Sequence, residues 1–210
     1  MQLWHGDCLE LMSDIPNKSI DMILCDLPYG TTACKWDTVI PFDKLWEQYN
    51  RIIKDKGAIC LFGSEPFSTE LRHSNLKMFK YDWIWEKEQG ANFMLVKYQP
   101  YKVHEIISVF SKKLHFYYPQ MTEGKPYISG KGTSGDITGN VIKTQTKNNG
   151  TRYPRSIQRF NTDKAKGSLH PTQKPVALLE YLIKTYTSEG ETVLDNCMGS
   201  GSTGVACINT

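Results

Sequence analysis

Two short loops in the sequence combine residue types that can hold or activate a ligand. The first is Asp26-Leu27-Pro28-Tyr29-Gly30, which directly follows an apolar run at residues 20–25. The second spans residues 195–204 and reads DNCMGSGSTG. Glycines let the backbone approach a ligand closely, while a neighbouring carboxylate can hold one of its polar groups. The second loop has no lysine of the kind found in a phosphate-binding loop, so alone it also fits a tight structural turn.

A basic segment in the middle of the chain is a third candidate region. Residues 115–168 contain nine lysines and arginines and three acids, a net charge of +6, whereas the whole chain carries +3. The same segment contains seven of the 16 glycines and six tyrosines and phenylalanines. A phosphate backbone and exposed bases attract such interleaved basic and aromatic residues. A solvated loop without fixed structure is the alternative that composition leaves open.

Strands and helices are predicted to alternate on both sides of this segment. Short apolar runs predict strands at residues 20–25, 57–63, 82–86, 105–110 and 192–194. Apolar residues at helical spacing predict helices at residues 41–54 and 65–73 and a third helix that opens at Pro175. The alternation indicates an α/β fold with a doubly wound parallel sheet, whose loops gather at the carboxyl ends of the strands.

Length and composition exclude several classes of protein. The chain has 210 residues, 40% of them apolar and 22% charged, which is typical of one globular domain with an insertion. Its longest apolar run, residues 58–62, is far shorter than the roughly 20 residues that span a bilayer, and the N-terminus has no signal-peptide pattern. Six cysteines without a C-x-x-C pair indicate reduced thiols, so we expect a cytoplasmic protein. The scattered histidines predict no metal site.

Together the two loops resemble the motifs of DNA amino-methyltransferases that use S-adenosylmethionine. Asp26-Leu27-Pro28-Tyr29 resembles the catalytic D-P-P-Y motif, and residues 193–204 resemble the cofactor motif V-L-D-x-x-x-G-S-G-[ST]-T-G. The catalytic motif comes first, the basic variable segment second and the cofactor motif last, which is the permuted order of the β group of these enzymes. Gly6-Asp7-Cys8, His104-Glu105 and HPTQKP at residues 170–175 match further motifs in order.

The resemblance implies that Asp26, Leu27, Pro28 and Tyr29 are catalytic. The exocyclic nitrogen of adenine is a poor nucleophile because its lone pair is delocalised into the ring. The Asp26 carboxylate and the Leu27 carbonyl would accept its two N–H bonds and aim the lone pair at the methyl group. Leu27 replaces a proline of the family, but any residue supplies a carbonyl, and Pro28 favours an extended Leu27. Tyr29 would stack on a base rotated out of the duplex.

The resemblance also implies sites for the cofactor and for double-stranded DNA. Asp195 and the glycine backbone would hold the methionine part of S-adenosylmethionine, with Lys174 directed towards its carboxylate. The expected cofactor residues are Asp7, Cys8, His170, Thr172, Lys174, Asp195, Gly199, Ser200 and Gly201. The residues expected to contact DNA phosphates are Lys147, Arg152, Arg155, Arg159, Lys164 and Lys166. Asn196 and Cys197 stand where Pro-Phe is common in the family, which predicts a looser loop.

The predicted architecture is a Rossmann-like S-adenosylmethionine methyltransferase sheet in circularly permuted order with an inserted target-recognition segment. Residues 1–114 form the catalytic half, residues 115–168 the basic insertion and residues 169–210 the cofactor-binding half. The predicted reaction is site-specific methylation of adenine N6 in duplex DNA by base flipping, as in restriction-modification systems. Dimers are common in the group, so a homodimer is an expectation, although the sequence shows no dimer face. Residues 120–126 have the style of phage or prophage members.

Three alternatives stay open on the sequence alone. Methylation of cytosine N4 uses the same fold, but its first motif position is usually Ser where this chain has Asp26. A catalytically silent DNA-binding fragment is the second, because family members continue into a ribose-binding strand, whereas this sequence stops at Thr210. That strand would lie between the cofactor strand and one near Gln2-Leu3-Trp4, so we expect a shortened form with a gap in the sheet. An RNA methyltransferase fits the motif order less well.

Overall fold

The computed structural model describes residues 1–34, 37–130, 132–134, 141–143, 145–162 and 173–210. The chain forms two units, of which the larger contains Met1–Tyr118 and Ser156–Thr210 and the smaller Pro119–Arg155. All six cysteines are free thiols. Within the described ranges, no helix has both the length and the apolar character needed to cross a membrane.

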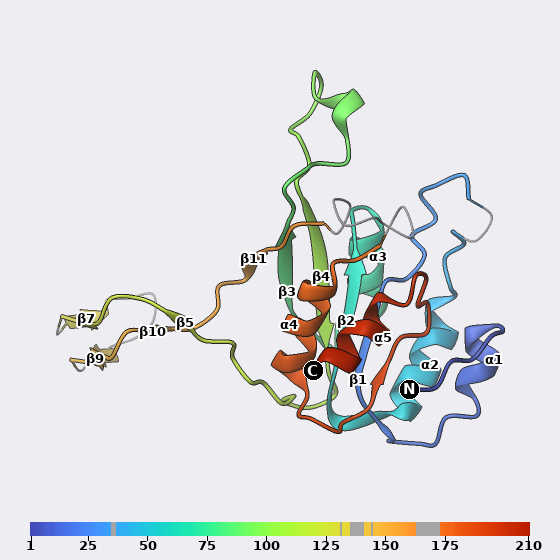
Figure 1. The fold of residues 1–210 in the computed structure, drawn as a ribbon, viewed down its shortest axis with the longest axis horizontal. Helices are drawn as coiled ribbons and strands as arrows, with labels where there is room; N and C mark the ends of the chain where they lie inside the picture. The colour runs from blue at the N-terminus through green and yellow to red at the C-terminus, as the bar shows by residue number, and fades with distance from the viewer. Residues whose placement is uncertain (35–36, 131, 135–140, 144, 163–172) are drawn as a thin grey trace. The chain divides into compact units, whose positions relative to one another are not determined.

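A six-stranded sheet with the order β11-β3-β4-β2-β1-β12 is the frame of the larger unit (Figure 1). Its strands are β1 (Ile20–Cys25), β2 (Ile53–Gly63), β3 (Phe79–Glu86), β4 (His104–Phe110), β11 (Ile157–Arg159) and β12 (Val193–Leu194). The helices are α1 (Cys8–Met12), α2 (Phe42–Ile52), α3 (Phe67–Ser74), α4 (Val176–Tyr186) and α5 (Ser202–Asn209). The five strands and three helices expected from apolar spacing are therefore confirmed, within a few residues at their ends.

The sheet is mixed, so the expectation of a parallel sheet is confirmed for the pairs β1–β2, β1–β12 and β3–β11 but is wrong for β4. Strand β1 runs parallel to β2 and β12, but β4 lies antiparallel to both β2 and β3. Parallel neighbours need a crossover that returns the chain to the starting edge, usually through a helix. Residues 87–103 contain only the 3₁₀ turn η1 (Phe93–Leu95), so the chain folds back beside β3 and enters the sheet in the opposite direction.

Both faces of the sheet are covered, because the core has two apolar clusters that share β1. Ile23 and Cys25 face a cluster that includes the buried residues of α2 and α3. Met22 and Leu24 face a second cluster that includes the buried residues of α4. Alternation of side chains along a strand explains why all six residues of β1 are buried. The doubly wound character predicted from the sequence is thus confirmed.

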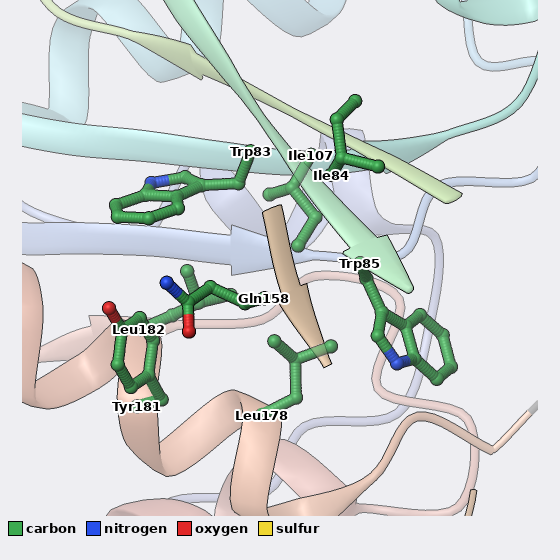
Figure 2. A pocket seen from close by; sticks show the side chains of 8 residues that line it. All are labelled: Trp83, Ile84, Trp85, Ile107, Gln158, Leu178, Tyr181 and Leu182. Atoms are coloured by element: carbon green, nitrogen blue, oxygen red, sulfur yellow. The ribbon is translucent and has the colours of Figure 1, made fainter. Parts of the chain in front are cut away.

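The α4 side of the sheet is filled by large apolar side chains. Figure 2 shows Trp83 and Trp85 of β3 and Ile107 of β4 facing Leu178 and Leu182 of α4. Gln158 of β11 and Tyr181 of α4 line the same shallow pocket. None of the eight residues that line it belongs to the loops at residues 26–29 or 195–201, so this pocket supports packing and no part of the candidate chemistry.

The N-terminal residues do not form the strand expected near Gln2-Leu3-Trp4. Residues 1–7 have no strand structure, and Leu3 and Trp4 are exposed. Asp7 instead caps helix α1, because its Oδ1 accepts a hydrogen bond from the backbone N–H of Leu9 at 2.8 Å. A strand needs a hydrogen-bonded neighbour, and β12 forms the outer edge of the described sheet on that side.

The described part of the smaller unit consists of three antiparallel pairs of short strands. Its antiparallel pairs are nested: β5 (Thr122–Glu123) with β10 (Thr151–Arg152), β6 (Tyr127–Ile128) with β9 (Lys147–Asn148), and β7 (Gly132–Ser134) with β8 (Val141–Lys143). The Arg152 guanidinium lies over the Tyr127 ring, 4.7 Å from its centroid. The basic segment therefore has paired backbone, and the alternative of an unstructured loop does not describe this part of it.

Leu24 offers a direct test of the core. Its side chain is fully buried, so we expect Leu24→Ala to lower the free energy of unfolding by about 2–5 kcal/mol through lost burial and a residual cavity. Leu76→Ala, at an exposed leucine, is the matched control and should change that free energy by less than about 0.5 kcal/mol. Urea unfolding followed by circular dichroism measures both values. Equal effects would contradict the placement of β1 in the core.

Candidate active site

The two loops singled out from the sequence lie side by side at one edge of the sheet. Strands β1 and β12 are parallel neighbours, with Ile23 opposite Leu194. Asp26 directly follows β1 and Asp195 directly follows β12. Because adjacent strands are about 4.8 Å apart, the loops leave the sheet next to each other. Their proximity comes from strand order, since residues 26 and 195 are far apart in the chain.

The Asp26 carboxylate is held by two donors. Its Oδ1 accepts a hydrogen bond from the Tyr29 hydroxyl at 2.7 Å, and its Oδ2 accepts one from the Lys174 ammonium. Lys174 is buried, and its Nζ also lies 3.5 Å from Glu105 Oε2. Burial by itself would lower the pKa of Lys174, but the charges of Asp26 and Glu105 outweigh that effect and raise it. Lys174, expected at the cofactor, thus contacts the candidate catalytic acid.

Glu105 extends this contact into a chain of alternating charges. Its Oε1 accepts a hydrogen bond from Lys87 Nζ at 2.7 Å, so Lys87, Glu105, Lys174 and Asp26 form a continuous network. Burial would raise the pKa of Glu105, but Lys174 and Lys87 lower it. The sequence indicated Glu105 only as part of a motif match. Lys87 was missed, because nothing in its local sequence distinguishes it from a surface lysine.

Tyr29 has a packed ring and an engaged hydroxyl. The ring stacks on Phe67 of α3, with centroids 4.9 Å apart and planes 28° apart. Burial, together with the charge of Asp26, raises the pKa of Tyr29 well above its ordinary value, so the hydroxyl is a hydrogen-bond donor at neutral pH. Leu27, between these side chains, is buried. The sequence prediction that Tyr29 stacks on a base stays a prediction; its observed stacking partner is Phe67.

Asp37 holds the loop after Asp26 in place, and sequence reasoning missed it. Its carboxylate accepts four backbone hydrogen bonds at 2.7–2.9 Å, from the N–H groups of Tyr29, Gly30, Thr31 and Thr32. Burial would raise its pKa, but the hydrogen bonds from Thr32 and the loop backbone lower it. A single aspartate several residues after a turn carries no specific sequence signal.

The loop after β12 is closed around Asp195 and open at its glycines. Asp195 accepts hydrogen bonds from the Cys197 N–H at 3.0 Å and the Thr203 hydroxyl at 2.6 Å. Burial raises the pKa of Asp195. Gly199 and Gly201 have φ angles of +50° and +79°, and no heavy atom lies within 4 Å of the position that a Gly199 Cβ would take. Backbone at Gly199 is therefore accessible to a ligand.

The base of this loop is tied to the core, contrary to the expectation of a looser loop. The buried Tyr49 donates a hydrogen bond to Asn196 Oδ1 at 2.6 Å. Cys197 and Cys8 pack against the cluster that contains Cys25. Burial raises the pKa of the Cys25 thiol to about 11, so this thiol stays protonated at neutral pH. Asn196 and Cys197 thus replace the family's usual pair with a different set of anchoring contacts.

The remaining predicted site residues have separate placements. Ser200 Oγ lies 3.0 Å from Ser202 Oγ at the start of α5. In the smaller unit, Lys147 and Arg155 are exposed, whereas Arg152 donates to Asn148 Oδ1 at 2.5 Å and to the Lys125 carbonyl. Arg159 is exposed on β11 of the larger unit. The predicted residues His170, Thr172, Lys164 and Lys166 lie outside the described residues.

Comparisons with known proteins bear on this arrangement. The sequence model of one protein family, described as DNA methylase, matches residues 20–210. The type II methyltransferase M2.MboI of Moraxella bovis is 25% identical over 98% of this chain and 78% of its own length. M2.DpnII of Streptococcus pneumoniae is 27% identical over 98% and 80%. The DNA adenine methyltransferase YhdJ of Escherichia coli (strain K12) is 25% identical over 97% and 73%.

Solved structures show the same fold. The M1.HpyAVI–SAM complex superimposes with a TM-score of 0.64 at 20% identity, over 99% of this chain and 88% of that one. The PvuII DNA methyltransferase, described as cytosine-N4-specific, gives a TM-score of 0.67 at 17% identity, over 98% and 77%. The predicted Rossmann-like methyltransferase architecture is therefore confirmed.

Replacement of Asp37 by asparagine tests the loop clamp. An amide has one acceptor oxygen instead of two, so Asp37→Asn leaves part of the four N–H groups without a partner. We expect a loss of about 2 kcal/mol in the free energy of unfolding and faster amide hydrogen exchange at Tyr29–Thr32. The exposed Asp14→Asn is the control. Unchanged exchange at residues 29–32 would show that Asp37 does not hold the loop.

The charge network predicts a pH-dependent effect at Glu105. Its folded-state pKa is lowered, so the ionised form stabilises the fold above its unfolded pKa, about 4.3, and that stabilisation is lost as pH falls through the folded pKa. Glu105→Gln should therefore cost about 3 kcal/mol at pH 7, and the difference from wild type should shrink on acidification. Chemical unfolding at a series of pH values measures it. A pH-independent difference would exclude the charge network as its cause.

Proposed function

The chain belongs to the DNA methylase family, and from that membership we propose that it transfers a methyl group from S-adenosylmethionine to adenine N6 in duplex DNA. The placement of Asp26 beside the Asp195 loop, on neighbouring parallel strands, is the observation that carries the proposal. S-Adenosylmethionine supplies a methyl group bound to a positively charged sulfur. The chain's own residues must then hold the cofactor, hold the base and manage the charge on the accepting nitrogen.

Asp26 has free acceptor capacity for an amino group. Each carboxylate oxygen has two lone pairs, and the bonds from Tyr29 and Lys174 use one on each oxygen. A third bond, from the amino group of a flipped adenine, can therefore form without displacing either partner. The Leu27 carbonyl accepts the second amino hydrogen, which aims the nitrogen lone pair at the methyl group. The Asp26 charge stabilises the positive charge that develops on that nitrogen before it releases a proton.

Lys174 forms an ion pair with this carboxylate and can serve the cofactor as well. An ammonium group has three N–H donors. In the structure one donor points to Asp26 Oδ2, and Glu105 Oε2 lies within 3.5 Å. The third donor remains for the carboxylate of the cofactor, the role that the family resemblance implies. One buried lysine thus links the acceptor site to the cofactor site.

The loop after β12 fits a cofactor of this kind. Its glycine backbone is open at Gly199, and it leads into the N-terminus of α5, where backbone N–H groups attract anions. Asp195 offers a half-buried carboxylate to the ammonium of the methionine part. Asp7-Cys8 lies near this loop, because Cys8 and Cys197 pack against the same apolar cluster, and we assign it to the adenine end of the cofactor.

Phosphate contacts are assigned to exposed basic residues of the segment that the sequence singled out. Lys147 and Arg155 of the smaller unit and Arg159 of the larger one are exposed and positively charged. We expect them to neutralise phosphates without reading the base sequence. The Arg152 guanidinium lies over the Tyr127 ring and donates a hydrogen bond to Asn148 Oδ1. Among the described residues, Arg152 therefore stabilises the paired strands of the smaller unit. Lys164 and Lys166 keep the predicted phosphate role.

Adenine is preferred over cytosine because the first position of the catalytic loop is Asp26. In the cytosine-N4 enzymes of the family that the sequence resembles, this position is usually serine. The name of the relative YhdJ, a DNA adenine methyltransferase, supports the same choice, whereas the PvuII enzyme shows that cytosine-N4 methylation uses this fold too. The phage or prophage style of residues 120–126 stays a prediction, which sequencing of the flanking genes would check.

Product analysis tests the proposal. The protein is incubated with unmethylated duplex DNA and S-adenosylmethionine, the DNA is digested to nucleosides, and the products are weighed by mass spectrometry. We expect N6-methyladenine, with a loss of about 100-fold or more in Asp26→Asn, which keeps the shape but removes the charge. Sequencing of the modified DNA gives the recognition site. The exposed Asp14→Asn, which should retain full activity, is the control.

The other products each contradict a stated part of the proposal. N4-Methylcytosine would keep the fold and the role of Asp26 and overturn the choice of base. Methylation of RNA in preference to DNA would overturn the substrate. No methylated product, with DNA still bound, would show a DNA-binding protein without catalysis. Full activity of Asp26→Asn would remove Asp26 from the mechanism.

A further inference from the structure

The connection between β3 and β4 exposes an unusual set of apolar side chains. Phe93, Met94 and Tyr98 are 76%, 90% and 86% exposed. Leu95, Val96 and Tyr101 are also exposed, and all six lie between residues 93 and 101. Contiguous exposed apolar residues on a protein surface mark interaction sites, because their solvation is unfavourable. Neither the proposed chemistry nor the basic segment uses this tip, which we define as residues 91–101.

Hydrogen bonds fix the base of the tip, which we call the neck and which consists of residues 90–92 and 100–102. The Ala91 N–H donates to the Lys102 carbonyl at 3.2 Å, and the Lys102 N–H donates to Asn92 Oδ1 at 2.7 Å. Asn92 Nδ2 donates in turn to the Pro100 carbonyl at 3.0 Å. A Cβ at Gly90 would come within 2.6 Å of the Tyr101 ring, so this position requires glycine. Asn92 thus closes the loop from within, and the apolar side chains face outward from a closed turn.

The tip leaves the sheet at the edge that carries Asp26. Strand β4 is antiparallel to both β3 and β2, so β3 and β2 run in the same direction. Strand β1 is parallel to β2 and therefore also runs in the direction of β3. The carboxyl end of β3 and the carboxyl end of β1 therefore lie at the same edge, and Figure 1 shows the β3–β4 connection extending beyond that edge. Ion pairs also connect the two ends of the β3–β4 connection with Asp26. Lys87, just after β3, binds Glu105 of β4, and Glu105 lies beside Lys174, which binds Asp26.

The charge of the tip matches a nucleic acid. Between residues 90 and 102 the only charged residues are Lys97 and Lys102, and there is no acid. Lys102 donates to Ser64 at the end of β2, while Lys97 is exposed on the tip itself. An apolar surface without acidic residues can approach polyphosphate, and a lysine beside it can contact a phosphate. Apolar side chains such as Phe, Leu and Met are those that proteins insert between base pairs.

We propose that the tip at residues 91–101 is a DNA wedge, whose Phe93 and Met94 enter the base stack next to the base that is rotated towards Asp26. Rotation of a base out of a duplex costs unstacking and leaves a gap. A side chain that fills this gap lowers the cost and keeps the base from returning. This inference rests on the proposed DNA methylation. A second copy of the chain is the competing partner for the same apolar surface, and the test separates the two.

Fluorescence of 2-aminopurine measures the wedge directly. The duplex carries the recognition sequence found by sequencing, with 2-aminopurine at the target base, whose fluorescence rises when it leaves the stack. We compare wild type, the double variant Phe93→Ala/Met94→Ala and the control Leu76→Ala, an exposed leucine in the turn between α3 and β3, at saturating protein. DNA affinity is followed by fluorescence anisotropy, and the mass in solution by light scattering.

The wedge predicts a specific pattern. In the double variant the fluorescence rise should be at least about threefold smaller than in wild type, and the methylation rate about tenfold lower. Its DNA affinity should change by less than about threefold. Its mass in solution and its thermal stability should match wild type, and Leu76→Ala should match wild type throughout. The single variant Met94→Leu keeps Phe93 and an apolar side chain of similar size at residue 94. It should therefore retain most of the fluorescence rise of wild type.

The opposite results overturn the proposal and are distinguishable from failure of the proposed function. Methylation with an unchanged fluorescence rise in the double variant overturns the wedge alone. A fall in the mass of the double variant assigns the tip to self-association and also overturns the wedge. If wild type methylates no base in any DNA, the proposed function fails, and the wedge fails with it.

Discussion

A lysine ammonium buried between two carboxylates is the interaction on which the site depends. Removal of a charge from water costs several kcal/mol, so Lys174 remains charged in its position only because Asp26 and Glu105 neutralise it. Lys87 balances the second carboxylate. The four groups come from the end of β1, both roots of the β3–β4 connection and the segment before α4. The orientation of Asp26 therefore depends on the nearby Tyr29 hydroxyl and on Lys174, which is 148 residues away in sequence.

The two loops beside this network differ in a way that suits their proposed tasks. The loop after Asp26 is held rigidly, since Asp37 accepts four of its backbone N–H groups and Phe67 packs on Tyr29. A fixed acceptor aligns a nucleophile without paying orientation entropy during the reaction. The loop after β12 is fixed at its base through Asn196, yet its backbone is open at Gly199. That combination leaves room for a ligand without loosening the loop.

The reversal of β4 places a third segment, the β3–β4 connection, beside the two loops of the candidate active site. Had β4 followed β3 through a helical crossover, the connection would have packed on a sheet face. Because β4 is antiparallel to β3, residues 87–103 instead project from the edge that carries Asp26 and Asp195. The same reversal brings Glu105, near the start of β4, close to Lys87, just after the end of β3. The direction of one strand thus positions both the charge network and the exposed apolar tip.

The elements and the two loops could be predicted from the sequence. Apolar runs and helical spacing indicated β1, α2 and α4, because burial of one face leaves a periodic pattern in neighbouring residues. Asp26 and Asp195 were evident since their loops follow buried strands with particular residue types. The antiparallel direction of β4, the contact of Lys174 with Asp26 and the bonds from Asp37 to the Tyr29 loop became visible in the folded structure alone. These depend on contacts between residues distant along the chain, and such contacts leave no periodic pattern around either partner.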